Sequence, residues 1–439
     1  MFKIATLLWL PATTKRVSNI LSRSVLGAAV VCVFLAGCGS SVESGSGGAS
    51  SGDGNRTPGV AGSSSIKAKT ISVGGFHACA VLEAGDVKCW GDNALGQLGN
   101  GSDSSISGPV AVSGLNEPTR TVAAGRYHTC AALESGAVKC WGGNESGEAG
   151  SSKSQRCSGG LDESNGDCRL EPVIVEGLTG SVEKLSAGWY HTCALLQSGA
   201  IACWGDNGSG ALGDGSKTPS PRAVTVKGLS GKAVDVSAGD SFTCALLDSG
   251  SVQCWGDNEY GKLSADPETA ASESTAPITV SGLGETAGQV TTATGHGCAL
   301  LTSGAVQCWG ENVSGELGDG TSDDSATPVA VSGLNGSAKA VGAGGSHSCA
   351  LLEDGSVQCW GTNRDGDLGS SQVSTGDGAN SATPVSVEGL GGKATAIAVG
   401  TTSTCALLED SSVRCWGDNF DGQLGSTSVG KSSTPLEVK

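Results

Sequence analysis

The residues best suited to chemistry are cysteines and histidines that recur together along the chain. Cysteines separated by nine residues form seven pairs: Cys79 and Cys89, Cys130 and Cys140, Cys193 and Cys203, Cys244 and Cys254, Cys298 and Cys308, Cys349 and Cys359, Cys405 and Cys415. The five histidines all stand two residues before the first cysteine of a pair, at His77, His128, His191, His296 and His347. Thiolate and imidazole are metal ligands, a low-pKa thiol is a redox group, and paired thiols form disulfides. These three chemistries are the hypotheses to separate.

The stretch 191–205 predicts a β-hairpin, in which two short apolar runs flank the turn residues Gln-Ser-Gly. A three-residue loop over 197–199 requires a left-handed backbone at Gly199. This loop places Leu195 opposite Ile201 and Cys193 opposite Cys203. The cysteines then form a non-hydrogen-bonded cross-strand pair, which brings the α-carbons within disulfide range.

Metal and redox chemistry both fit the pattern poorly. No Cys-x-x-Cys spacing, which is typical of redox-active thiols, occurs in the sequence. The histidine series is interrupted by Phe242 and Ser403. Acidic and glycine-containing segments at 206–210 and 363–367 lack the ligand order of a calcium loop and are better interpreted as turns. We therefore expect structural disulfides, no metal or other cofactor, and no enzymatic activity.

The first 66 residues predict export and a tether. Residues 1–37 carry four basic and no acidic side chains, and an apolar run ends in Leu-Ala-Gly before Cys38. This ending resembles a bacterial lipobox, which implies cleavage before Cys38 and lipidation of its thiol. An ordinary secretory leader or a short anchor helix is the alternative. Residues 38–66 then form the lipidated cysteine and a flexible Gly/Ser tether.

The charge narrows the set of partners. The formal net charge is −17, and it is −21 without residues 1–37. Because phosphate binding needs clustered Lys and Arg, nucleic acid and anionic lipid surfaces are disfavoured as partners, and membrane contact is expected through the lipid alone. In an exported chain, the sixteen cysteines that remain without Cys32 and Cys38 favour disulfides over metal thiolates.

The hairpin is one part of a longer repeat that extends over residues 67–439. A Trp-Gly follows every second cysteine, at Trp90, Trp141, Trp204, Trp255, Trp309, Trp360 and Trp416. An asparagine lies three residues after each tryptophan, at Asn93, Asn144, Asn207, Asn258, Asn312, Asn363 and Asn419. A Val/Ala-rich segment precedes each hairpin and a Pro-containing extended segment follows it. A period near fifty residues with about four strands per unit predicts an all-β fold, a β-propeller with seven blades and a cross-strand disulfide in each blade.

Two segments of the repeat resemble the regulator of chromosome condensation family. They are Trp-Gly-Asp-Asn-Ala-Leu-Gly-Gln-Leu-Gly at 90–99 and Ala-Gly-Trp-Tyr-His-Thr-Cys-Ala-Leu at 187–195. The resemblance covers residues 67–439 and implies a closed seven-bladed propeller, in a bacterial exported member of the family. The paired cysteines are not part of the general family pattern, and the basic arms and β-wedge of the eukaryotic exchange factor have no counterpart. We further predict that residues 435–439 lie beside strand 69–73 and clasp the ring within one shared blade.

Positions where the repeats differ are the candidates for binding. An insertion between 150 and 170 contains Cys157 and Cys168, which we expect to pair. The loops before the hairpins of the first four repeats carry unusual side chains, namely Phe76, Arg126, Tyr127, Trp189, Tyr190 and Asp240. Equivalent loops of a propeller gather on one face, and Trp, Tyr and Arg dominate binding hot spots. The alternative is that these aromatics only cover blade edges. In the seventh repeat Ser411 replaces the turn glycine, which predicts a less stable hairpin.

These observations favour a binding or scaffold protein of the bacterial cell envelope. It would be lipid-anchored, with the outer membrane favoured, periplasmic or surface-exposed, and monomeric. Its partner would be another envelope or extracellular protein, or a glycan. The family resemblance offers two alternatives: guanine-nucleotide exchange, and inhibition of a β-lactamase or a penicillin-binding protein.

Overall fold

The computed structural model describes residues 65–157, 166–264, 271–426 and 430–439. The predicted leader, Cys38 and nearly all of the tether lie outside these residues. Within them, no helix is long and apolar enough to cross a membrane.

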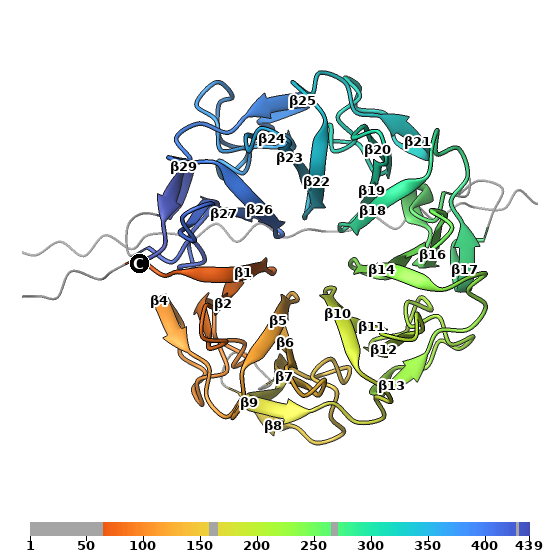
Figure 1. The fold of residues 1–439 in the computed structure, drawn as a ribbon, viewed down its shortest axis with the longest axis vertical. Helices are drawn as coiled ribbons and strands as arrows, with labels where there is room; N and C mark the ends of the chain where they lie inside the picture. The colour runs from red at the N-terminus through yellow and green to blue at the C-terminus, as the bar shows by residue number, and fades with distance from the viewer. Residues whose placement is uncertain (1–64, 158–165, 265–270, 427–429) are drawn as a thin grey trace, which may run out of the picture. The chain divides into compact units, whose positions relative to one another are not determined.

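The described residues form seven antiparallel sheets arranged as blades around a common centre, which confirms the predicted seven-bladed propeller (Figure 1). The chain visits the blades in order, and the strands of each blade are consecutive. The first strands, which lie nearest the centre, are β1 (Ala68–Val73), β5 (Thr119–Ala124), β10 (Val182–Ala187), β14 (Ala233–Ala238), β18 (Ala287–Thr292), β22 (Ala338–Ala343) and β26 (Ala394–Val399).

The second and third strands form the stapled hairpins. The second strands are β2 (His77–Leu82), β6 (His128–Leu133), β11 (His191–Leu196), β15 (Phe242–Leu247), β19 (His296–Leu301), β23 (His347–Leu352) and β27 (Ser403–Leu408). The third strands are β3 (Val87–Gly91), β7 (Val138–Gly143), β12 (Ile201–Gly205), β16 (Val252–Asp257), β20 (Val306–Gly310), β24 (Val357–Thr362) and β28 (Val413–Asp418).

The outer strands complete the blades. They are β4 (Ile106–Ala111), β9 (Asp167–Ile174), β13 (Ser220–Thr225), β17 (Glu273–Thr279), β21 (Ser325–Ala330), β25 (Asn380–Ser386) and β29 (Lys431–Glu437). Blade 2 has a fifth, short strand, β8 (Gln155–Arg156), which pairs with β9. The described residues contain one helical turn, the 3-10 helix η1 (Glu259–Gly261).

The hairpins have the register that the turn chemistry predicts. Leu195 pairs with Ile201 and Cys193 with Cys203, while Gly199 takes a left-handed φ of 81°. The seven hairpin disulfides have Cα–Cα distances of 4.0–4.1 Å, as expected for directly opposed residues in a non-hydrogen-bonded pair. The hairpin strand β11 is buried at every position, because neighbouring blades cover both of its faces.

The tryptophans join successive blades. The indole Nε1 of Trp204, in blade 3, donates a hydrogen bond of 2.9 Å to the main-chain oxygen of Glu148 in blade 2. All seven repeat tryptophans are fully buried and donate in this way to the preceding blade. A buried indole N–H needs an acceptor, so the same side chain supplies packing and a directional contact.

A ring of main-chain hydrogen bonds joins the blades at the centre, just beyond the first strands. The bonds measure 3.0–3.3 Å and run from Gly75 N to Gly125 O, Arg126 to Gly188, Trp189 to Gly239, Asp240 to Ala293, Thr294 to Gly344, Gly345 to Gly400 and Thr401 to Gly74. This close approach explains the glycine of the Ala-Gly motif, since a Cβ on Gly188 would lie 2.1 Å from the oxygen of Gly239.

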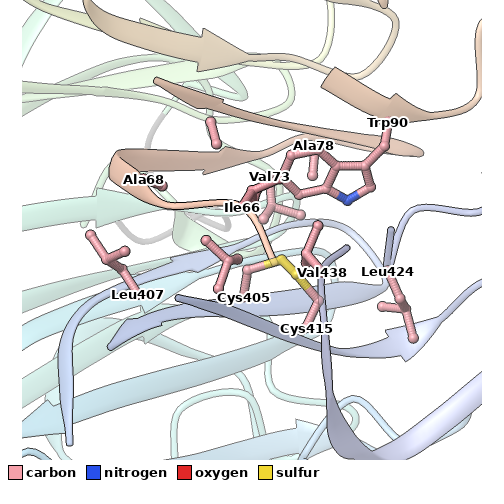
Figure 2. Close-up of a cluster of buried hydrophobic side chains, with 12 residues drawn as sticks. Ile66, Ala68, Val73, Ala78, Trp90, Cys405, Leu407, Cys415, Leu424 and Val438 are labelled. Atoms are coloured by element: carbon pink, nitrogen blue, oxygen red, sulfur yellow. A yellow bond between two sulfur atoms is a disulfide. The ribbon is translucent and has the colours of Figure 1, made fainter. Parts of the chain in front are cut away.

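The predicted shared blade is wrong, although the two ends of the fold do lie beside each other. β29 belongs to the last blade and β1 to the first, so each blade is built from one continuous stretch of chain. The described fold begins with the first strand β1 and ends with the outer strand β29, so the break in the ring falls between two blades. Closure comes from packing: Val438 lies in one buried cluster with Ile66, Ala68 and Trp90, and Ile66 N donates to Val438 O at 3.3 Å (Figure 2).

The hairpin of blade 7 adopts the same turn despite its serine. Ser411 has a left-handed φ of 67°, a conformation that costs a residue with a Cβ about 1–2 kcal/mol. We predict that Ser411→Gly raises the free energy of unfolding by about 1 kcal/mol. Urea denaturation of the variant measures this change. The matched variant Gly199→Ala, at the same position of blade 3, should lower stability, and equal effects of both variants would contradict the interpretation.

Candidate functional site

The six predicted binding residues lie in equivalent loops, between the first and second strands of blades 1 to 4. The loops that follow the third strands lie at the same end of the blades. Asp92 N donates to Phe76 O at 2.9 Å, and Asp206 N donates to Tyr190 O at 2.8 Å. Both kinds of loop together form one end of the ring, which we name the loop face.

Four of the six side chains converge on the guanidinium group of a fifth, Arg126. The Cζ of Arg126 lies 4.0 Å from the ring centroid of Trp189, 5.0 Å from that of Tyr127, 5.6 Å from that of Tyr190 and 5.9 Å from that of Phe76. Arg126 Nη1 also donates a hydrogen bond of 2.6 Å to the hydroxyl of Tyr190. We name these five residues the arginine cluster. They come from three adjacent blades, so the ring fold is what brings them together.

The aromatic rings are ordered by one another as well as by the cation. Phe76 and Tyr127 stack with centroids 5.5 Å apart, and Trp189 meets Tyr190 edge to face at 6.3 Å. All five residues of the arginine cluster are half-buried. Burial raises the pKa values of Tyr127 and Tyr190, so both phenols stay protonated at neutral pH. The rings of the arginine cluster thus pack against one another and against the guanidinium, while part of the surface of each side chain remains open to a partner.

The sixth residue, Asp240, is not part of the arginine cluster. Burial raises the pKa of its carboxyl, while Lys262 acts in the opposite direction. Lys262 is itself buried, pairs with Asp257 at 2.5 Å and lies 5.5 Å from the ring centroid of Phe242. Blade 4 therefore contributes a charged sector next to the arginine cluster.

The loop face also carries exposed apolar side chains that sequence reasoning missed. Val313 is 64% exposed, Phe420 75% and Tyr260 36%. Each stands one or two residues after the repeat asparagine, in the loop that follows a third strand. The signal was available in the sequence, because most repeats have a small or polar residue there. Acidic side chains directly follow the Trp-Gly, at the last position of the third strand or just after it; they are Asp92, Asp206, Asp257, Glu311 and Asp418.

The insertion of blade 2 borders the arginine cluster. Cys157 and Cys168 are disulfide-bonded, with a Cα–Cα distance of 6.0 Å. Both are buried in a small cluster with Leu95, against which Tyr127 packs. The insertion, of which residues 158–165 lie outside the described part, therefore adds a stapled element beside the Arg126 sector of the loop face.

The histidines have a structural role that the sequence analysis anticipated only in part. His191 Nε2 lies 2.8 Å from the hydroxyl of Thr243 in the next blade, and each of the other four histidines makes the same contact at 2.7–2.8 Å. Burial lowers the pKa to about 3 for His77, His128 and His296 and to about 4 for His191 and His347. Within the described residues, no group of three or more His, Cys, Asp or Glu could hold a metal ion.

A pattern in the sequence indicates this contact between a histidine and a hydroxyl of the next blade. The hydroxyl acceptor directly follows the histidine position of the next repeat. In the two repeats without a histidine, Phe242 faces a blade that has Gly297 at the acceptor position, and Ser403 faces one that has Ala78. Donor and acceptor are thus lost together, as expected for a pair that links neighbouring blades.

The fold and its loop face define a class: a disulfide-stapled seven-bladed propeller with an aromatic and arginine-containing loop face. A family model described as RCC1-like domain matches residues 29–348, and RCC1 repeat models match residues 338–367, 394–423 and 354–407. The chain belongs to the RCC1-like family, as the sequence resemblance predicted.

Relatives of known sequence include the Ultraviolet-B receptor UVR8 of Arabidopsis thaliana, 29% identical over 367 residues that cover 82% of this chain and 79% of the receptor. The E3 ubiquitin-protein ligase HERC2 of Homo sapiens is 30% identical over 298 residues, 66% of this chain and 6% of the ligase. Among solved structures, Prp20p from Saccharomyces cerevisiae has a TM-score of 0.70 at 20% identity, covering 81% of this chain and 86% of that one. Human WBSCR16 has a TM-score of 0.68 at 21% identity, covering 81% and 94%. These structural likenesses establish the fold.

Proposed function

We propose that this protein binds another protein through its loop face, as an envelope-anchored scaffold of a bacterial cell. The arginine cluster carries the proposal. It gathers Trp, two Tyr, Phe and Arg at the end of the ring, half-buried and preordered. These are the residue types that dominate binding hot spots, and their packing reduces the side-chain entropy lost on association.

The family supports a role in protein binding. Yeast RCC1 (Prp20) is bound to Kap60 in one solved structure, and the structure of Prp20p is described together with its binding to Gsp1p and histones. This chain shares the fold of those proteins and presents different side chains. We therefore infer from them only that the propeller serves as a binding platform. The side chains of the loop face would determine which partner binds.

Two observations support the envelope location. The segment before Cys38 has the order of a lipoprotein signal, and the blades hold disulfides that persist in oxidising compartments. Mass spectrometry of the N-terminal peptide tests this part separately. A diacylated Cys38 is the expected result, and a chain that retains residues 1–37 would contradict it.

The partner-binding test is cross-linking and affinity capture from the cells that produce the protein. We predict that Trp189→Ala or Tyr190→Ala reduces the captured partner at least about tenfold, because hot-spot truncations cost about 2 kcal/mol or more. Ile174→Ala is the matched control. Ile174 is 55% exposed, but it ends the outer strand β9 away from the loop face.

Two results would refute the loop face as the binding surface: equal capture by wild type and both loop variants, or loss of capture in the Ile174 control alone. Recovery of a GTPase as the partner would favour the exchange-factor alternative within the same surface.

A further inference from the structure

Four asparagines are directly followed by a glycine, at 100–101, 165–166, 207–208 and 335–336. In such a pair the glycine nitrogen can attack the side-chain carboxamide and close a succinimide ring, because glycine has no Cβ to obstruct the approach. The attack requires an exposed carboxamide, a glycine N–H without a hydrogen-bond partner, and room for the backbone to turn. Asn165 lies outside the described residues, so three pairs can be compared.

The fold protects Asn207 from this reaction. The side chain is fully buried, its Nδ2 donates to the main-chain oxygen of Ser216 at 3.1 Å, and its Oδ1 accepts from Leu212 N at 3.0 Å. The N–H of Gly208 donates to a carboxyl oxygen of Asp206 at 3.3 Å. Both the carboxamide and the attacking nitrogen are therefore held in hydrogen bonds.

Asn100 is held in a similar way, although it is less buried. Its Oδ1 accepts hydrogen bonds from Asn93 Nδ2 at 3.3 Å and from Ser102 N at 3.1 Å. The N–H of Gly101 donates to the main-chain oxygen of Leu170, in blade 2, at 3.1 Å. The carboxamide is thus fixed in orientation, and the attacking nitrogen already has a partner.

The pair at 335–336 meets all three conditions. Both residues are exposed, in a bend between the outer strand β21 of blade 5 and the first strand β22 of blade 6 (Figure 1). Within the described part of the chain, no hydrogen bond holds the Asn335 carboxamide or the Gly336 N–H. A Cβ added to Gly336 would meet no atom within 4 Å, so no other segment crowds the glycine. The bend is attached through Asn335 N, which donates to Gln358 Oε1 at 2.7 Å.

We propose that Asn335 is a site of non-enzymatic covalent modification, at which the side-chain amide is converted to a carboxylate. The Gly336 nitrogen loses its proton and forms a bond to Cγ of Asn335, while the bond from Cγ to Nδ2 breaks and ammonia leaves. Water then opens the succinimide at either carbonyl, which gives aspartate or isoaspartate. In isoaspartate the main chain runs through the former side chain. Water is the only co-reactant, and no electron is transferred.

The modification acts at a joint between two blades. Ser337 O accepts a hydrogen bond of 3.0 Å from Glu353 N, in the hairpin turn of blade 6, so the bend lies at the end of the ring opposite the loop face. Isoaspartate lengthens the main chain of the bend by a methylene group, and either product adds a negative charge. The preceding bend between blades makes an equivalent bond, from Gly284 N to Gln307 Oε1 at 2.9 Å. Bonds of this kind join successive blades, and we expect isoaspartate to weaken the joint between blades 5 and 6.

The test incubates the full chain at pH 7 and pH 8 and follows its proteolytic peptides by mass spectrometry and by isoaspartate-specific methylation. In the folded protein, Asn335 should be converted before Asn100 and Asn207, and several-fold faster at pH 8, because the attacking nitrogen must lose its proton. Asn335→Gln should lose the signal, since glutamine would have to close a larger ring. Gly336→Ala has open space for its methyl group and should slow conversion several-fold, because that group obstructs the attack.

The reduced chain in urea is the matched control, since protection then disappears and all three asparagines should be converted at similar rates. Equal conversion of Asn335 and Asn207 in the folded protein, or conversion of Gly336→Ala as fast as that of wild type, would overturn the proposal. The aged wild type should also unfold at a lower urea concentration than Asn335→Gln aged in parallel. Equal unfolding midpoints would contradict the effect on the blade joint. These outcomes are independent of partner capture by the loop face.

Discussion

The propeller should lose several kcal/mol of stability between pH 6 and pH 4. Five buried histidines have folded-state pKa values of about 3 to 4, whereas an unfolded histidine titrates near 6.5. Between these values the unfolded chain binds more protons, so the free energy of unfolding falls as the pH falls. Each histidine contributes about 2 kcal/mol of loss over this interval.

Three buried carboxyls act in the opposite direction. Burial raises the pKa of Glu148, Glu316 and Asp367 to about 7, so protonation on acidification stabilises the folded state. Of the other shifted carboxyls, four have raised and four have lowered pKa values. Below pH 6, the stability lost through the five histidines therefore exceeds the stability gained through the three carboxyls. Between pH 6 and 8, these two contributions to the free energy of unfolding nearly cancel.

Denaturation by urea at pH 8, 6, 5 and 4 measures this profile. The matched variant is His191→Phe combined with Thr243→Gly, which copies the pair Phe242 and Gly297 that the chain already uses between blades 4 and 5. Its loss between pH 6 and 4 should be smaller than that of wild type by about 2 kcal/mol. A profile without an acid-side fall, or a variant with the wild-type slope, would show that the histidines do not control acid stability.

Glu316→Gln should stabilise the protein at pH 8 by about 3 kcal/mol and change it little at pH 4.5. Glu316 is 1% exposed, and its Oε2 accepts a hydrogen bond of 2.8 Å from Ser314 N, while Oε1 has no hydrogen-bond partner. Its raised pKa means that the folded state holds the proton more tightly than the unfolded chain does. Stability is therefore greatest below the unfolded pKa near 4.5 and is lost as the pH rises toward 7.

The chain itself shows that glutamine fits this position. Gln97, the equivalent residue of blade 1, accepts from Leu95 N at 2.9 Å and donates to Asp92 at 2.7 Å. Glu311 stands where Asp92 does in the repeat, so a glutamine at 316 would have both an amide donor and a carboxylate acceptor. Glu353→Gln, at an exposed hairpin turn, is the control and should have little effect at either pH. A pH-independent change in Glu316→Gln would contradict the assigned titration.

The fold could be predicted almost completely from the sequence, because the same strand pattern recurs in seven repeats. The cysteine register followed from one three-residue turn, since Gly199 fixes which residues face each other. The predicted shared blade was wrong because the order of the strands along the chain does not determine between which strands the ring is open. The blade boundary depends on packing between complete sheets, as Val438 against Ile66 and Trp90 shows.

The candidate site was predicted at the level of loops, but not of contacts. The loop residues that differ between the repeats include all five residues of the arginine cluster. Membership depends on contact with the long Arg126 side chain, which packs against Phe76 and Trp189 from neighbouring blades but not against Asp240. Val313 and Phe420 were overlooked because their loops otherwise follow the repeat.

Photo-cross-linking from single positions tests the central claim most directly. A benzophenone amino acid in place of Tyr190, in the arginine cluster, is compared with one in place of Ile174, on outer strand β9, in the cells that produce the protein. We predict a discrete cross-linked protein from position 190 and none from position 174. Cross-linking from position 174 alone, or identical products from both positions, would contradict a binding role for the loop face.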